Sequence, residues 1–297
     1  MTSTLTARPA SHRARPVPRS GTRRRRTLYF IATHAIAIAL AIMFAAPIVF
    51  VALTALMTDE QALTSSLWPQ EWNWSNFSEV FSKSHLLQWT ANTFVYAATA
   101  TVFMLLSSVP VAYALARFRF RGRKAAFLLV ITMMMLPPQV VAVPVYTLWA
   151  RFELTGTLWP LILPMLLGDA FSIFLLRQFL VTIPRDYTDA ARVDGCTDFS
   201  TLIRVILPMA RPAIAAVALF TFFYCWNDYY GPLLYTDPGE QSSWTLSLGL
   251  ATFKAFHSVQ WNLTMAATLL VTAPVIIVFF FAQRVFIEGV TLTGVKG

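Results

Sequence analysis

The chain has little charge and few histidines, and each shortage disfavours a class of protein. Only 12% of its 297 residues are charged, about half the share of a typical soluble domain. The four histidines, His12, His34, His85 and His257, show no metal-ligand spacing, and no Ser-His-Asp grouping is recognisable. The sequence therefore argues against a soluble domain, a metal centre and an enzyme, and we expect a non-catalytic protein.

Cysteines and phosphate-binding motifs are also scarce. Cys196 and Cys225 are the only cysteines; we place one in a cytoplasmic loop and the other in a membrane span, so no disulfide is expected. The sequence contains no GxxxxGK[ST] motif and so lacks the backbone cradle and lysine that ATP phosphates require. No internal repeat is visible, which disfavours a secondary transporter built from two repeated halves.

Apolar residues, in contrast, make up 57% of the chain and gather in six long runs. Each run is long enough to cross a hydrocarbon core of about 30 Å. We predict an all-α, polytopic membrane protein with six transmembrane helices near residues 29–56, 89–116, 125–150, 158–182, 212–235 and 262–282. Prolines inside these runs, such as Pro110, Pro138 and Pro274, are expected to kink or break the helices.

Basic residues are distributed unevenly between the predicted loops. Nineteen of the 23 Lys and Arg residues fall on one side of the membrane and three on the other, so the positive-inside rule places both termini in the cytoplasm. Residues 1–27 are expected to be a disordered cytoplasmic tail, residues 28–284 the transmembrane domain and residues 285–297 a second cytoplasmic tail. The basic tail lacks the interleaved aromatics of a nucleic-acid-binding arm; we expect a lipid bilayer around the chain and no nucleic acid.

Residues 183–211 are the longest stretch that does not resemble a span. Pro184 suits a helix start, Gly195 fits a left-handed C-terminal cap, and Thr197 or Asp198 can cap a second helix. The apolar side chains predicted to share one face of that second helix are Phe199, Leu202, Ile203 and Ile206, before Pro208 ends it. From spacing alone, a loop folded back onto the bilayer surface is the alternative; a DNA-reading helix pinned between two spans could hardly reach a groove.

Small and charged residues in the first of these two helices favour a docking surface. Asp189 has the spacing for ion pairs with Arg185 and with Arg192. Ala190 and Ala191 leave a shallow surface that another protein can approach closely. This element would lie on the inner side of the membrane.

The same stretch resembles the EAA loop of permease subunits in type I ABC importers, which has EAA, three residues, Gly, and later an apolar residue followed by Leu-Pro. The residues here are Asp189-Ala190-Ala191, three residues ending at Asp194, Gly195, and then Ile206-Leu207-Pro208. Asp189 replaces the usual Glu, which keeps the charge and shortens the reach. Leu136-Pro137-Pro138-Gln139, Trp226-Asn227-Asp228 and the ending 289–297 resemble the carbohydrate-importing branch, in particular its maltose/multiple-sugar six-span subunit.

The resemblance implies a permease of the bacterial inner membrane that moves a sugar or related solute inward. The implied partners are a second homologous permease, which forms a heterodimer with this one, two cytoplasmic ATPase subunits that use ATP and Mg²⁺, and an extracytoplasmic solute-binding protein. No cofactor is implied for this chain itself. The loop 183–211 would be the coupling helix that docks in a cleft of the ATPase, through Asp189, Ala190, Ala191, Asp194, Gly195, Phe199 and Pro208. The C-terminal tail would reach the ATPase dimer or be a frayed terminus.

Polar residues inside the predicted spans are candidates for the solute path, because ionisable groups there are costly. Asp169 follows Gly168, which permits a helix break. Asp169 is expected to lie on the solute path or at a subunit interface; the alternative is that it makes a structural hydrogen bond to another span. Asn227, Asp228 and Tyr229 combine an amide, a carboxylate and a ring, which suit a sugar; an interfacial aromatic belt is the alternative. Asn92 and Gln139 are weaker candidates, because lone amides often join membrane helices.

The rival class is a self-sufficient secondary transporter or channel. Such a protein would transport on its own under an ion gradient and would be indifferent to ATP. The element at residues 183–211 distinguishes the two classes, because an ATPase-driven importer needs it and the rival does not.

Overall fold

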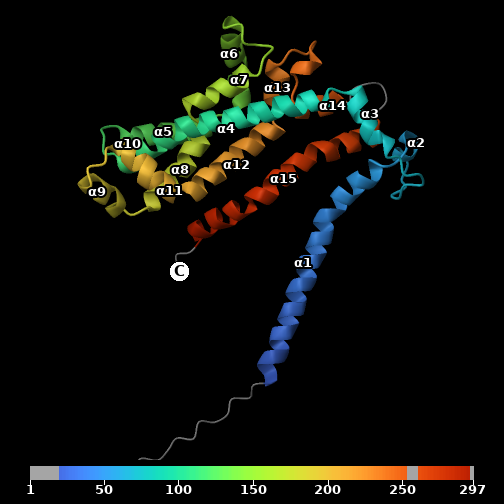
Figure 1. The fold of residues 1–297 in the computed structure, drawn as a ribbon, viewed down its shortest axis with the longest axis horizontal. Helices are drawn as coiled ribbons and strands as arrows, with labels where there is room; N and C mark the ends of the chain where they lie inside the picture. The colour runs from blue at the N-terminus through green and yellow to red at the C-terminus, as the bar shows by residue number, and fades with distance from the viewer. Residues whose placement is uncertain (1–19, 253–259, 295–297) are drawn as a thin grey trace, which may run out of the picture. The chain divides into compact units, whose positions relative to one another are not determined.

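The structure is a computed structural model that describes residues 20–252 and 260–294 (Figure 1). Every named element in these two ranges is a helix, and the one isolated bridge among them joins Gly156 to Thr236. The chain divides into two compact units, residues 1–50 and residues 51–297, and each is described by itself.

The helices follow one another with short connections. In chain order they are α1 (Ser20–Thr54), α2 (Asp59–Ala62), α3 (Ser75–Lys83), α4 (Leu86–Arg117), α5 (Arg123–Met134), α6 (Pro138–Arg151), α7 (Trp159–Ile162), the 3₁₀ turn η1 (Leu163–Leu167), α8 (Ala170–Thr182), α9 (Asp186–Val193), α10 (Asp198–Thr201), the π turn η2 (Leu202–Ile206), α11 (Leu207–Met209), α12 (Arg211–Asn227), α13 (Tyr230–Tyr235), the 3₁₀ turn η3 (Gln241–Ser243), α14 (Leu246–Thr252) and α15 (Trp261–Gly294).

The described part of the first unit is α1 up to Phe50. An 18-residue window within residues 25–54 has a mean hydropathy of 2.8, and the His34 ring bonds the carbonyl of Phe30 at 2.8 Å within the same helix. The helix begins at Ser20, inside the range expected to be a tail, because arginines are good helix formers and an established helix propagates into them. The rest of that predicted tail, residues 1–19, lies outside the described residues.

Apolar helices of membrane-spanning length confirm the predicted all-α polytopic fold. Four helices in the described ranges qualify, Arg25–Thr54, Leu86–Arg117, Trp159–Thr182 and Trp261–Phe280. Two bent pairs qualify together, Arg123–Met134 with Pro138–Arg151 and Asp198–Met209 with Arg211–Asn227. The described residues therefore hold four such helices, or six if each bent pair is one span.

The third apolar run is bent, as its prolines predicted, while the fifth differs from the expected continuous helix. α5 and α6 meet at 96°, where Pro137 is extended with φ −66° and ψ 133° and disfavours a helical conformation for the residue before it. The run predicted at 212–235 stops at Asn227, and α13 is a separate helix. An 81° bend at Ala210 sets α12 apart from the preceding element.

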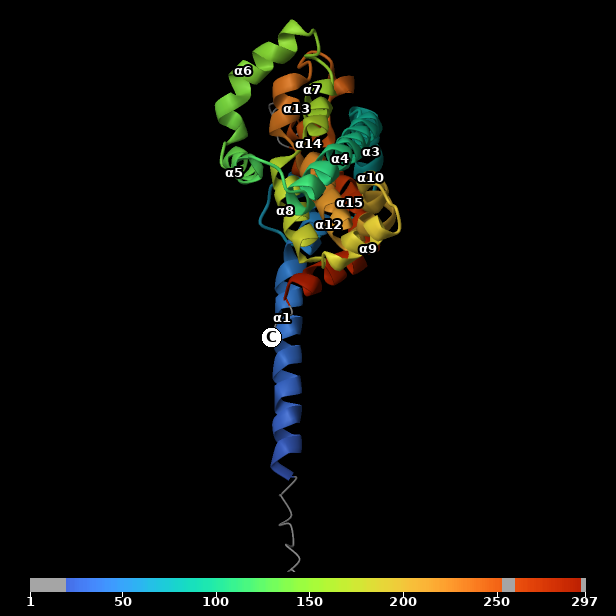
Figure 2. The same ribbon diagram turned by 90° about the vertical axis from the view of Figure 1, so that its left-hand side faces the viewer.

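α4 is the central helix of the second unit, and α8 and α12 pack along it (Figures 1 and 2). Small buried residues on α4, including Ala97, Ala100 and Ala112, let these neighbours approach closely. At its first end, Trp89 packs with Trp244 and Leu246. Its other end packs against α8, η2 and the first part of α12.

A buried amide joins three segments near the first end of α4. Asn76 is fully buried; its Nδ2 donates to the carbonyls of Ala55 and Met57 at 2.9 and 2.8 Å. Its Oδ1 accepts a hydrogen bond from Asn262 at 3.2 Å. The side chain of one α3 residue therefore ties the segment after α1 to the start of α15.

α15 is longer than the last predicted span. It continues from Trp261 to Gly294, past the expected end at residue 282 and into the range expected to be a tail. The remaining residues of that tail, 295–297, lie outside the described part of the chain.

Candidate functional site

The first candidate site is the two-helix element at residues 186–209, which begins with a helix ended by a Schellman motif. The N–H of Cys196 donates to the Ala191 carbonyl at 2.9 Å, and the N–H of Gly195 donates to the Arg192 carbonyl at 3.0 Å. Gly195 has φ +79°, which confirms the left-handed cap. A Cβ at this position would meet no atom within 4 Å, so the need for glycine comes from backbone conformation and not from space.

Arg192 connects the two helices. It pairs with Asp198 at 3.1 Å and with Asp189 at 4.0 Å, and the hydrogen bond that it donates to the Asp198 carboxylate raises the pKa of Arg192. The Thr197 hydroxyl caps α10 by accepting from the Ser200 N–H at 3.2 Å, so Thr197 is the cap and Asp198 is free for this ion pair. The expected pair of Asp189 with Arg185 is not among the ion pairs of the described residues.

α9 presents one face to the rest of its unit and another to the outside. Thr188 and Ala191 are buried, while Asp189, Ala190 and Val193 are exposed. The expected shallow docking surface therefore includes Ala190 but not Ala191. Small Ala191 instead faces inward, where it lets α9 pack close to η2.

Only half of the apolar face predicted for the second helix is buried. Leu202 and Ile206 lie in the core, but Phe199 and Ile203 are 70% and 45% exposed. The segment that follows Thr201, η2, is a π turn, in which the N–H of Leu207 bonds the Leu202 carbonyl. The wider turn changes the angular spacing of the side chains that follow.

Pro208 lies inside the short α11 and does not itself end the helix. It is exposed and has no N–H, and the π turn before it absorbs the missing hydrogen bond. The chain bends two residues later, at Ala210. The exposed Asp194 is the C-cap residue of α9.

The element is attached to the end of α4. The guanidinium of Arg117 donates to the Ile183 carbonyl at 2.8 Å, just before α9. Leu202 and Ile206 pack in the same core cluster as Ala116 and Leu115. A displacement of the element would therefore act directly on the end of α4 through these contacts.

The second candidate site is the predicted solute path, which starts at the break before α8. Gly168 has φ +101°, which confirms the expected break. The Asp169 carboxylate caps α8 by accepting from the Ser172 N–H at 2.7 Å, and the Asp169 N–H donates to the Ser108 hydroxyl of α4 at 3.1 Å. The link to another span is thus made by the backbone of Asp169, while its half-buried carboxylate serves its own helix.

Asp228 holds the break between α12 and α13 against α4. One carboxylate oxygen accepts from the Tyr96 hydroxyl at 3.0 Å and the other from the Gly231 N–H at 3.0 Å. Tyr96 is buried, and a Cβ on Gly231 would lie 2.5 Å from an Asp228 oxygen. Both carboxylate oxygens are therefore engaged within the protein, so Asp228 positions this break.

The predicted amides have different surroundings. The Asn227 amide donates to the Phe223 carbonyl at 2.8 Å in its own helix, and the residue is exposed. Asn92 donates to two carbonyls of the η3 loop, including that of Trp244 at 2.9 Å, so it joins α4 to this loop. Gln139 is exposed in the first turn of α6. No hydrogen bond among the described residues joins these three amides to one another.

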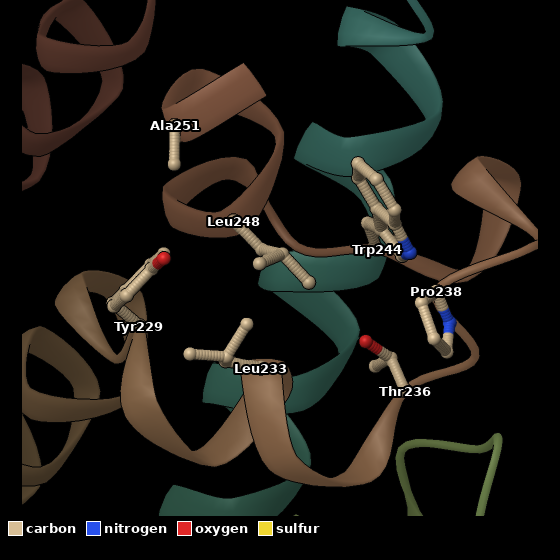
Figure 3. Close-up of a pocket in the computed structure, with 7 residues that line it drawn as sticks. All are labelled: Tyr229, Leu233, Thr236, Pro238, Trp244, Leu248 and Ala251. Atoms are coloured by element: carbon tan, nitrogen blue, oxygen red, sulfur yellow. The ribbon is translucent and has the colours of Figure 1, made fainter. Parts of the chain in front are cut away.

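Tyr229 contributes to a pocket that the sequence did not reveal. The pocket has a volume of about 280 Å³, and Figure 3 shows side chains of α13, α14 and their connection around it. Its lining residues are Tyr229, Leu233, Thr236, Pro238, Trp244, Leu248 and Ala251. The sequence signal available for this site was Trp244, a bulky aromatic in an otherwise polar stretch; its partners lie on separate elements that only the fold brings together.

The two-helix element at 186–209 and the Tyr229 pocket lie at opposite ends of α4. Trp89 near its start stacks with Trp244 at 6.4 Å, whereas Arg117 at its end bonds Ile183. At 1.5 Å per residue, about 40 Å of helix separates them. In the part of the chain that the structure describes, no three His, Cys, Asp or Glu residues are grouped to hold a metal.

A bundle of membrane-length helices, with an exposed two-helix element at one end and a pocket at the other, has the architecture of a membrane permease. The chain belongs to the family of binding-protein-dependent transport system inner membrane components, whose model matches residues 108–291, more than half of the chain. It is a multi-pass permease subunit of an ABC importer, and the matched region includes α9, the bend at Ala210 and the Tyr229 pocket.

Two kinds of relative agree with this assignment. The chain is 33% identical over 223 residues to the arabinooligosaccharides transport system permease protein of Halalkalibacterium halodurans, a match that covers 75% of this chain and 79% of that protein. In fold it is similar to a chain of a bacterial ABC transporter involved in the import of the acidic polysaccharide alginate, with a TM-score of 0.74 at 21% identity, covering 91% and 99% of the two chains. A bacterial alginate ABC transporter in complex with an alginate pentasaccharide-bound periplasmic protein gives a TM-score of 0.64 at 15% identity, covering 88% and 94%.

Proposed function

We propose that this permease imports a sugar or a related solute. It acts as one half of a heterodimer with a second homologous permease, receives its solute from an extracytoplasmic solute-binding protein and is driven by two cytoplasmic ATPase subunits. Support for the solute class comes from the relative that transports arabinooligosaccharides. The alginate transporter in complex with a periplasmic protein supports the proposal that a solute-binding protein delivers the solute.

The observation that carries this proposal is the construction of the element at residues 186–209. One face, with Asp189, Ala190 and Phe199, is exposed, while the opposite face is packed against the end of α4. The Schellman turn at Gly195 and the ion pair from Arg192 join the two helices at close range. A partner that binds the exposed face would therefore move α9 and α10 as one rigid body.

The predicted coupling residues then fall into two groups. Asp189, Ala190, Asp194 and Phe199 are exposed and contact the ATPase. The remaining members set the shape of the element: Ala191 by its inward packing, Gly195 by its backbone and Pro208 by its place after the π turn. ATP and Mg²⁺ are bound by the ATPase, since this chain has no phosphate-binding motif.

The solute passes beside the Tyr229 pocket and the break at Asp169. A tyrosine ring offers a flat apolar face for sugar C–H groups and a hydroxyl for hydrogen bonding. The exposed Asn227 and Gln139 remain available to solute. Asp228 and Asn92 act on the path indirectly, by holding the α12–α13 break and the η3 loop in position.

Substitution of Gly195 tests the coupling role. Gly195→Val forces a β-branched residue into the left-handed region, which costs on the order of 1–2 kcal/mol, whereas Gly195→Asn is the matched control because asparagine tolerates that conformation. We expect Gly195→Val to lower ATP-driven uptake at least tenfold in proteoliposomes that hold the whole complex, and Gly195→Asn to retain most of it. Both variants should insert into the membrane, because the Cβ meets no neighbour.

Two results would contradict the coupling role. One is normal uptake by Gly195→Val. The other is uptake by this chain alone, without ATPase subunits, under an ion gradient, which would favour the secondary-transporter class.

A further inference from the structure

Basic side chains converge where α4, α5 and α8 meet. The turn between α4 and α5 carries Arg119 and Arg121, and α5 begins with Arg123 and Lys124. Arg177 approaches them from α8. The Arg177 guanidinium lies over the Phe127 ring of α5, 3.7 Å from its centroid, and is close enough to Arg123 for their charges to repel. These five residues are called the basic cluster.

The basic cluster has no carboxylate to balance it. None of the ion pairs in the described part of the chain includes any of its members. Arg123 donates to the Phe118 carbonyl at 3.1 Å and Arg177 to the Gln178 amide oxygen at 2.9 Å. The Nε of Arg177 is buried without a hydrogen-bond partner. Protein groups thus satisfy the basic cluster only partly, which leaves donor groups available to an anion.

The start of α5 is built in the same unbalanced way. Its N-cap is Gly122, no side chain caps it, and no acidic residue stands in its first turn. Instead Arg123 and Lys124 lie at the positive end of the helix dipole, where cations are unfavourable. An anion bound at this point would turn both the dipole and the cations into favourable interactions.

The surroundings of Arg177 place this anion at a lipid surface rather than in a protein interface in water. Arg177 lies one turn and a half before the end of α8, about 8 Å along the helix axis. Leu128 and Leu129 of α5 are 62% and 63% exposed, and Val181 of α8 is 53% exposed. Apolar surface for acyl chains therefore adjoins cations for a headgroup.

We propose that the basic cluster binds the phosphate of an anionic phospholipid, with the acyl chains along the exposed apolar residues of α5 and α8. Arg123 and Arg177 offer planar donor groups that match phosphate oxygens, and Arg119, Arg121 and Lys124 add attraction from the exposed turn. Basic pockets at the level of the headgroups are known lipid sites in membrane proteins.

Native mass spectrometry of the whole importer complex, purified and placed in nanodiscs with equal parts of phosphatidylglycerol and phosphatidylcholine, tests this site. The double variant Arg123→Gln/Arg177→Gln should retain phosphatidylglycerol at least tenfold less well than the wild type, because each cation removed should weaken lipid binding about fivefold. The control Arg151→Gln/Arg204→Gln removes the same amount of charge outside the basic cluster. This control should retain phosphatidylglycerol as well as the wild type does. Arg119→Gln/Arg121→Gln, confined to the exposed turn, should also lower retention and cannot disturb the core.

Four results would overturn the proposal. The first is unchanged phosphatidylglycerol retention in both cluster variants, and the second is an equal loss in the control. In the third, the cluster variants keep the lipid but lose the paired permease or the ATPase from the complex; the basic cluster would then be a protein interface. Displacement of the lipid by millimolar inorganic phosphate alone would likewise show a free-phosphate site instead of a lipid site.

Discussion

At the scale of single residues, polar side chains in this bundle mostly set local geometry. A carboxylate near the middle of an apolar run looks like a solute ligand because its burial is costly. Asp228 shows another solution, since its two oxygens are satisfied by Tyr96 and Gly231. Asn76 satisfies carbonyls of a neighbouring segment in the same way. Buried polar groups are thus explained by their partners before any ligand is invoked.

At Asp169, the helix-capping role of the side chain can be separated experimentally from its negative charge. Asparagine caps a helix about as well as aspartate, whereas alanine costs about 1 kcal/mol. We expect Asp169→Asn to keep the thermal stability of the purified complex while lowering solute affinity in uptake assays by severalfold. Asp169→Ala should lower both quantities. If Asp169→Asn transports with wild-type kinetics, the carboxylate has no part in the solute path and only caps α8.

At the scale of elements, breaks in the helices are the main departures from the pattern of apolar runs. Hydropathy reports that a segment avoids water but not whether it is straight. Its prolines predicted a bend in the run at 125–150, whereas the run at 212–235 looked like a single helix. The α5–α6 bend has a local cause in the two prolines. The bend at Ala210 follows a π turn and a proline, a combination that hydropathy does not record.

Replacing both prolines tests whether they hold the α5–α6 bend of 96°. Spin labels at the exposed positions Leu129 and Val143 would be about 21 Å apart along one straight helix and closer across the bend. We expect Pro137→Ala/Pro138→Ala to lengthen the distance measured by pulsed electron resonance toward that value. The control Pro144→Ala, inside α6, should leave it unchanged. An unchanged distance in the double variant would show that packing holds the bend instead.

At the scale of the whole molecule, the two candidate sites are joined by one long helix. α4 bonds the η3 loop through Trp89 and Asn92 at its start and Ile183 through Arg117 at its end. This arrangement predicts that the two ends face opposite sides of the membrane, with the element at 186–209 in the cytoplasm.

The native cysteines allow that orientation to be measured. Cys196 is partly exposed beside Gly195, and Cys225 is buried. A membrane-impermeant thiol reagent should therefore label the Cys225→Ser variant in inside-out vesicles and not in intact cells with a permeable outer envelope. Leu67→Cys, at an exposed position of the α2–α3 loop, should behave in the opposite way in a Cys196→Ser/Cys225→Ser background. Labelling of Cys196 from outside the cell would reverse the proposed topology.

The sequence by itself determined the membrane-helical class, the left-handed cap at Gly195 and the break at Gly168. Each of these follows from local chemistry: apolar runs of sufficient length, and the conformations that only glycine adopts easily. The family pattern at residues 189–208 likewise lies within one short stretch, so it could be read without a fold.

Only the tertiary structure decided what depends on contacts between distant segments. It turned Ala191 inward, left Phe199 exposed, paired Asp228 with Tyr96 and assembled the Tyr229 pocket from α13, α14 and their connection. The physical reason is that a side chain's exposure is set by what packs against it, and a π turn or a bent span changes that without changing hydropathy. Periodicity therefore predicted the helices, while packing determined which of their faces meet the partner, the solute and the lipid.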